Sequence, residues 1–148
     1  MKQIRRISLL KESIIFIAAA IILVAFSSCA TRKATFLSSA VVPAAEGTVK
    51  VKKDNNKNYA IKVEVKNLAE PDRLQPAKNV YVVWIETSDN GIKNIGQIKT
   101  STAFLSSKLR AAFETVSSFN PVKLFITAEN NPAIQYPEGQ TILSTSNF

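Results

Sequence analysis

The stretch that decides the fold is "TVKVKKDNNKNYAIKVEVKNL", Thr48–Leu68. Apolar and polar side chains alternate before its polar centre, at Val49 and Val51, and after it, from Tyr59 to Val65. A period of two is typical of a β-strand with one buried face. The centre, "DNNKN", has the composition of a turn. The stretch therefore predicts an antiparallel hairpin with one face exposed to water.

Strand patterns continue towards the carboxyl end. "VYVVWIET", Val80–Thr87, is apolar on both faces and predicts a central strand whose Trp84 helps to fill the core. "SDNG" after it predicts a tight turn, because Asn-Gly tolerates positive φ, and Gly96 in the returning segment predicts a bulge. "PVKLFITAEN", Pro121–Asn130, predicts another strand, and "QTILSTSNF" predicts the last one.

The segment Thr102–Ser118 is compatible with a short helix or with a strand, and the β-structure on either side favours a strand near Ala111–Val116. Six or seven short strands within about 100 residues are typical of an antiparallel sandwich. We therefore expect residues 48–148 to form an all-β, immunoglobulin-like antiparallel β-sandwich.

The first residues have the composition of a targeting signal. A basic segment precedes an apolar run of 13 residues, Ile14–Phe26. This run is shorter than the roughly 20 residues of a membrane-spanning helix but fits the apolar part of a signal peptide. We expect residues 1–28 to be a lipoprotein signal peptide. Residues 29–47, rich in Ala, Ser and Thr, are expected to be a flexible tether. Its apolar residues can instead pack against the edge of the domain or form a first strand: Phe36, Leu37, Val41 and Val42.

"FSSC", Phe26–Cys29, resembles a bacterial lipobox, in which small residues precede an obligatory cysteine, although Phe26 replaces the usual leucine. The resemblance implies that Cys29 receives a diacylglycerol group, that the chain is cut before it, and that fatty acyl chains such as palmitate hold the protein on the membrane. The alternative is an uncleaved helix with a buried cysteine. Ala30 and Thr31 do not resemble an inner-membrane retention signal, so in a Gram-negative host we expect the periplasmic face of the outer membrane.

Composition argues against several classes of protein. The 148 residues include one cysteine and no histidine, and the net charge is +8. One cysteine excludes an internal disulfide, and the absence of histidine removes the commonest metal ligand and general base. "DNN" and "ENN", at Asp54 and Glu129, are interpreted as turns and not as calcium sites. We therefore expect no enzyme, no cofactor and no metal, and the moderate charge and periplasmic address predict no nucleic-acid partner.

A candidate binding surface lies on the predicted hairpin. Alternation places lysines on one of its faces, where they can contact anionic lipid, an anionic envelope polymer or an acidic protein. The alternative is that they only keep a sheet edge soluble. These lysines are Lys50, Lys52, Lys62 and Lys66.

The order "YVVWIE", "GIKNIGQI", "KLFITAEN" and "PEG" resembles the extracytoplasmic domain of anti-sigma-K-type regulators. The matching positions are Tyr81, Trp84, Gly91, Gly96, Thr127, Glu129, Pro137 and Gly139. The resemblance implies a β-sandwich with a sensing or protein-binding role. Those regulators also carry a cytoplasmic sigma-binding domain and a spanning helix, and only 13 residues precede the apolar run here, so we do not expect sigma inhibition.

Three functions remain open. The favoured one is a lipid-anchored, non-catalytic module that binds a periplasmic protein or an envelope polymer. The second is an accessory subunit or weak hydrolase that uses carboxylates such as Glu86 and Glu129, although alternation assigns Glu86 to the face of Trp84 and Glu129 to the face of Phe125 and Thr127. The third is a purely structural envelope lipoprotein.

Overall fold

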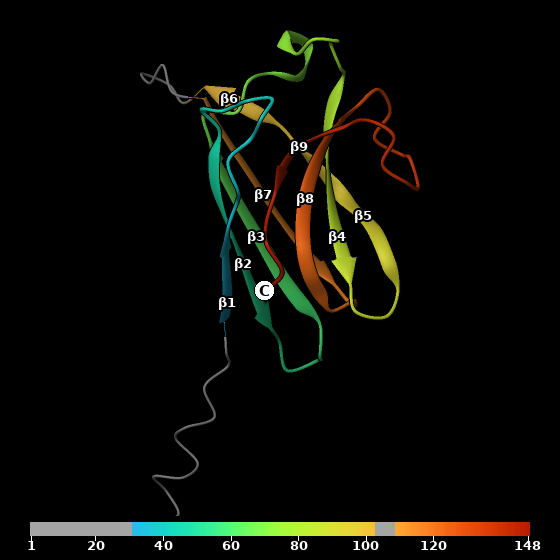
Figure 1. Cartoon of the computed structure of the whole chain (residues 1–148). Helices are drawn as coiled ribbons and strands as arrows, with labels where there is room; N and C mark the ends of the chain where they lie inside the picture. The colour runs from blue at the N-terminus through green and yellow to red at the C-terminus, as the bar shows by residue number, and fades with distance from the viewer. Residues whose placement is uncertain (1–30, 103–108) are drawn as a thin grey trace, which may run out of the picture.

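The computed structural model describes residues 31–102 and 109–148, which fold into two packed antiparallel sheets (Figure 1). The predicted signal peptide, Cys29 and residues 103–108 lie outside the described residues. The described part contains nine strands and one short 3-10 helix: β1 (Thr31–Thr35), β2 (Glu46–Lys53), β3 (Tyr59–Lys66), η1 (Pro71–Arg73), β4 (Val80–Thr87), β5 (Gly91–Ile98), β6 (Thr100–Thr102), β7 (Leu109–Ser117), β8 (Pro121–Glu129) and β9 (Gln140–Ser144).

The strand order identifies the type of sandwich. One sheet has the order β1-β2-β3-β7-β6 and the other the order β5-β4-β8-β9. Strands β2, β3, β7 and β6 occupy the A, B, E and D positions of the immunoglobulin Greek key, and β5, β4, β8 and β9 occupy C′, C, F and G. The predicted immunoglobulin-like β-sandwich is therefore confirmed. The described part has nine strands where six or seven were predicted; the additional ones are β1 on the outer edge of β2 and the short β6 beside β7.

The predicted hairpin is the β2–β3 pair. Val49 lies opposite Val63 and Val51 opposite Ile61, and all four side chains are buried between the sheets. The facing sheet contributes alternate residues of β4 and β8 to the same core: Tyr81, Val83, Ile85, Leu124, Ile126 and Ala128. The strand predicted at 111–116 is confirmed as part of β7. The predicted bulge is also present, because the register between β4 and β5 shifts beside Gly96, whose φ is +133°.

The predicted tether is wrong from Thr31 onward. Residues 31–35 form β1, which pairs along its whole length with β2, from Thr31 opposite Lys52 to Thr35 opposite Thr48. The following segment also packs on the domain, because Phe36 and Val42 are buried in the core. Residues 31–47 thus belong to the sandwich. The apolar residues after β1 pack on it as the alternative expected, except Leu37, which is exposed, but the first strand precedes them instead of containing them.

Arg32 fastens β1 to the other sheet. Its guanidinium donates hydrogen bonds to the carbonyl oxygen of Pro121 at 3.0 Å and to Oδ1 of Asn120 at 2.8 Å, at the start of β8. It also lies 5.6 Å from the ring centroids of Tyr59 and Phe148. A strand without an apolar stripe is therefore held by backbone pairing and by one cation that bridges the sheets.

Trp84 lies outside the main core. It belongs to a second, small cluster with Val82 and Phe125 on the outer face of the four-stranded sheet, and the Trp84 and Phe125 rings stack with centroids 6.3 Å apart. The cluster is sealed by the β8–β9 connection, residues 130–139, which we call the covering loop; its Ile134 packs against the cluster. Asn94 holds this loop by donating to the carbonyl oxygens of Pro132 and Ile134 at 2.9 and 3.0 Å.

Candidate functional site

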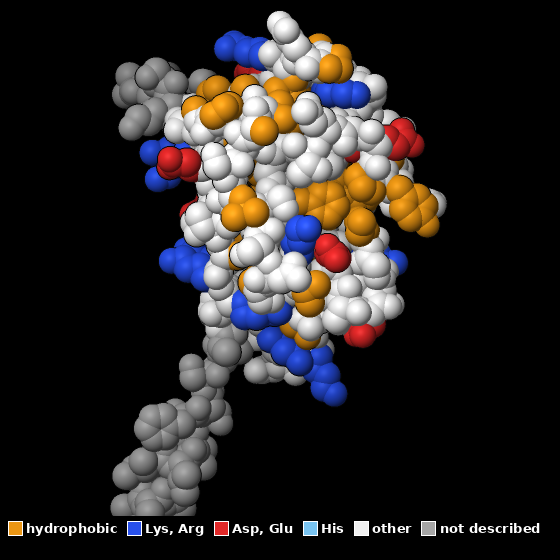
Figure 2. Space-filling model, viewed as in Figure 1, with side chains coloured by type: hydrophobic (Ala, Val, Ile, Leu, Met, Phe, Trp, Pro, Cys, Tyr) orange, Lys and Arg blue, Asp and Glu red, His pale blue; other side chains and the backbone are white. Residues whose placement is uncertain are grey.

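The four predicted lysines lie on the outer face of the five-stranded sheet, which we call the lysine face. Lys50 is opposite Lys62 in the β2–β3 ladder, and Lys33 of β1 is opposite Lys50 on the other side. These three lysines form a row across the strands, with Lys52 and Lys66 towards opposite ends of the hairpin. Figure 2 shows Lys and Arg side chains along the β1–β3 side of the molecule and around its lower end. The four lysines therefore lie on one exposed face, as alternation predicted.

The lysines of this face differ in their surroundings. Lys62 forms ion pairs with Glu114 at 2.7 Å and with Glu64 at 3.4 Å. The hydrogen bond to Glu114, its charge, and the same two effects from Glu64 raise the pKa of Lys62 above its usual value. In the part of the chain that the structure describes, Lys50 and Lys66 form no ion pair. The charge of Lys62 is therefore partly offset by two carboxylates, whereas Lys50 and Lys66 have no carboxylate within ion-pair distance among the described residues.

A shallow hollow of about 510 Å³ lies in the lysine face between β2, β3 and β7. Lys50, Lys52 and Lys62 form part of its wall, and exposed Ala60 and Val116 lie opposite each other in its floor. Apolar groups inside a basic rim can contact both the anionic groups and the less polar parts of an extended ligand.

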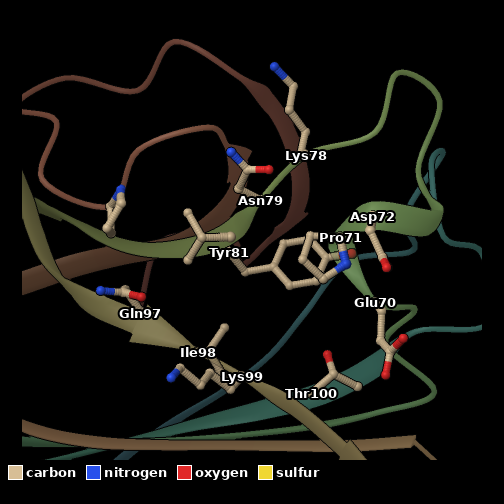
Figure 3. Close-up of a pocket in the computed structure, with 12 residues that line it drawn as sticks. Glu70, Pro71, Asp72, Lys78, Asn79, Tyr81, Gln97, Ile98, Lys99 and Thr100 are labelled. Atoms are coloured by element: carbon tan, nitrogen blue, oxygen red, sulfur yellow. The ribbon is translucent and has the colours of Figure 1, made fainter.

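A second depression, of about 620 Å³, lies at the end of the sandwich remote from the β2–β3 turn. Glu70, Asp72, Asn79, Gln97 and Thr100 contribute polar groups to its wall, and Figure 3 shows Tyr81 between them with its ring directed towards Pro71. Burial, together with the charge of Asp72, raises the pKa of Tyr81 to about 12, and its hydroxyl donates to the carbonyl oxygen of Ala69 at 2.9 Å. The phenol is therefore a neutral structural donor, and no feature of the sequence indicated this depression.

Glu86 and Glu129 do not form a carboxylate pair. Glu86 shares the face of Trp84, and Glu129 shares the face of Phe125 and Thr127, as predicted. The prediction that these are two different faces is wrong. Trp84 lies opposite Phe125 in the β4–β8 ladder, so both carboxylates are on the outer face of that sheet. They are near opposite ends of it, because Glu86 lies opposite Lys123 and Glu129 opposite Val80. Alternation orders residues within one strand, whereas the register between strands decides which faces coincide.

Glu129 is a structural centre. Its side chain is buried, and its Oε1 accepts hydrogen bonds from Oγ1 of Thr127 at 2.6 Å and from the backbone N–H groups of Glu138 and Gly139 at 3.2 and 3.0 Å. Thr127 in turn accepts a hydrogen bond from Nε1 of Trp84 at 2.8 Å. This chain of bonds ties the covering loop to the small cluster. Four positions that carry the resemblance to anti-sigma-K-type regulators, Trp84, Thr127, Glu129 and Gly139, therefore hold the loop in place.

Gly139 is required by space. A Cβ atom at this position would lie 1.9 Å from the carbonyl oxygen of Ala128, so no larger residue fits without moving backbone. The "PEG" element is thus the closing point of the covering loop.

Comparisons of the chain with protein-family models, with curated proteins and with solved structures find no match. Residues 31–102 and 109–148 contain neither a helix long and apolar enough to span a membrane nor a cluster of three or more potential metal ligands. The lysine face and the sequence before Thr31 are therefore the features that bear on function.

Proposed function

We propose that this chain is a lipid-anchored, non-catalytic protein of the cell envelope that binds an anionic envelope protein or polymer through the lysine face. The observation that carries the proposal is that this sheet face is uncovered by any described segment and yet holds a row of lysines. The covering loop closes the part of the other sheet's outer face around Trp84, so the two faces of the sandwich are built differently.

Charge on the face supports an anionic partner. Its outward positions carry six cations, Lys33, Lys50, Lys52, Lys62, Lys66 and Arg110, and three carboxylates, Glu46, Glu64 and Glu114. Like charges opposite each other in a ladder destabilise a sheet slightly, as for Lys33 and Lys50. An anionic ligand along the row relieves this repulsion, which gives the arrangement a binding role beyond solubility.

The anchor is proposed from the sequence. Acylation of Cys29 would hold the domain on the cell membrane, and in a Gram-negative host on the periplasmic face of the outer membrane. The small residues Ser27 and Ser28 and the placement of the only cysteine at the end of the apolar run support this part of the proposal.

The test is crosslinking in intact cells followed by mass spectrometry of the attached molecules. Four forms are compared: the unaltered chain, Cys29→Ser, the face variant Lys50→Ser with Lys66→Ser, and a control with Lys78→Ser and Lys99→Ser. The control removes the same charge from the remote end of the sandwich.

We expect one anionic partner to be recovered with the unaltered chain and none with Cys29→Ser. The amount of recovered partner should fall several-fold in the face variant and stay unchanged in the control. Equal recovery from the face variant and the control would contradict the role of the lysine face. A Cys29→Ser form that stays in the membrane with the same partner would contradict the lipid anchor.

A further inference from the structure

The connection between Cys29 and the folded domain is short. Strand β1 begins at Thr31, and Arg32, the next residue, is fastened to Asn120 and Pro121 of the opposite sheet. Two residues of fully extended chain span about 7 Å at most. A domain anchored at Cys29 therefore has its first strand within about 7 Å of the anchor, and no flexible tether lifts it away.

The start of β1 lies at a particular end of the sandwich. Thr31 is opposite Lys52, the last but one residue of β2, so the β2–β3 turn lies at the same end. The β4–β5 turn and the β7–β8 connection also lie at this end, the lower one in Figure 1. The remote end is about 25 Å further along the eight residues of β2.

The end next to the anchor is basic. Lys52, Lys53 and Lys57 surround the β2–β3 turn, whose carboxylate, Asp54, is engaged by the backbone N–H of Asn58 at 2.8 Å. Across the sandwich, Lys93 of β5 lies 5.3 Å from the ring centroid of Phe119, an aromatic residue that is 36% exposed. Asp89 in the β4–β5 turn is acidic, and so is Glu86 near the end of β4, which forms an ion pair with Lys123 at 3.7 Å. We call the four lysines Lys52, Lys53, Lys57 and Lys93 the basic end.

The short range of electrostatic interactions means that this end, and not the remote one, can interact with lipid headgroups. The Debye length at physiological ionic strength is about 8 Å, which is comparable with the 7 Å connection and about a third of the length of the strands. Charges at the basic end are therefore within reach of headgroups around the anchor. The remote end, where Glu70, Asp72, Lys78 and Lys99 mix both signs, is screened from them.

From these observations, and resting on the proposed anchor at Cys29, we propose that the basic end contacts anionic phospholipid headgroups, so that the sandwich stands end-on at the membrane. Lysines contribute point charges towards lipid phosphates, and the exposed, apolar Phe119 ring beside Lys93 can insert just below the headgroups. In this orientation the lysine face stands roughly upright and remains open to a partner.

The test uses the full chain purified from membranes and reconstituted into two kinds of vesicle. One kind is phosphatidylcholine alone, and in the other a third of the lipid is phosphatidylglycerol. Amide hydrogen exchange is followed by mass spectrometry in peptides that cover the β2–β3 turn, the β7–β8 connection and the remote end. The variants are Lys57→Glu with Lys93→Glu, and the matched control Lys78→Glu with Lys99→Glu, both checked for an unchanged melting temperature.

We expect slower exchange at the β2–β3 turn and the β7–β8 connection in the anionic vesicles only. Loss of two lysine contacts weakens the contact equilibrium about 30-fold, so the protection should disappear in the first variant and persist in the control. Equal exchange in both vesicles overturns the proposal. Protection along both strands of the β2–β3 hairpin also overturns it, because the domain would then lie on the lysine face.

The mass of the recovered protein tests the anchor separately. A chain without acyl groups refutes lipidation at Cys29. The apolar run would then hold the same chain in the same vesicles, so the exchange pattern still decides whether the basic end contacts lipid.

Discussion

Replacing Arg32 by alanine should destabilise the whole sandwich, because this side chain joins the two sheets where β1 begins. Arg32 makes two short hydrogen bonds, at 2.8 and 3.0 Å, and two ring contacts at 5.6 Å. A hydrogen bond from a charged donor contributes about 1.5 kcal/mol at the low end of its range, which suits a half-buried group. Each ring contact adds about 0.5 kcal/mol. We expect Arg32→Ala to lower the free energy of unfolding by about 4 kcal/mol.

The assay is urea unfolding of residues 29–148 carrying Cys29→Ser, followed by circular dichroism. Arg32→Lys is the matched variant, because it keeps the charge but loses the planar group that reaches two acceptors, and it should recover about half of the loss. A loss below about 0.5 kcal/mol in Arg32→Ala, the size of an ordinary surface substitution, would refute the reasoning and restore β1 to a loosely attached segment.

Three further predictions concern buried groups. Glu129→Ala leaves the Thr127 hydroxyl and two backbone N–H groups of the covering loop without their acceptor. Proteolysis within residues 130–139 should therefore accelerate, and the free energy of unfolding should fall by about 3 kcal/mol. Glu129→Gln keeps an acceptor oxygen and should lose less. Gly139→Ala should open the same loop to protease while the exchange of core amides in β3 stays slow; fast exchange in β3 would contradict a local effect. The raised pKa of Tyr81, about 12 against an ordinary value of about 10, gives stability that is complete below pH 10 and is lost as the pH rises towards 12, because only the unfolded state then releases the proton. Denaturation at a series of pH values should show that the free energy of unfolding falls by about 3 kcal/mol between pH 10 and pH 12 because of Tyr81. Tyr81→Phe should lack this contribution to the fall.

The fold was predictable because its main strands carry local signals. Alternation in Thr48–Leu68 placed the valines of β2 and β3 correctly, and the apolar runs located β4 and β8. These signals depend on residues close in sequence, and burial of one face fixes their register. The lysine face followed from the same alternation.

Three features were not predictable, because each depends on contacts between distant segments. Strand β1 has the sequence "TRKAT", without an apolar stripe, and Arg32 finds its partners 88 and 89 residues away. Trp84 looked like a core residue, yet the covering loop buries it on the opposite side of its sheet. The ion pair of Lys62 with Glu114 likewise depends on β7, which brings Glu114 beside it. A single sequence gives no register between such segments.

The position of Trp84 decides what an optical experiment on this protein would measure. It is the only tryptophan in the chain, and its ring is fully buried in the small cluster under the covering loop, outside the core between the sheets. Its fluorescence therefore reports whether residues 130–139 are packed against the small cluster. A shift in emission that precedes the loss of strand signal would show the loop lifting from a sandwich that is still intact.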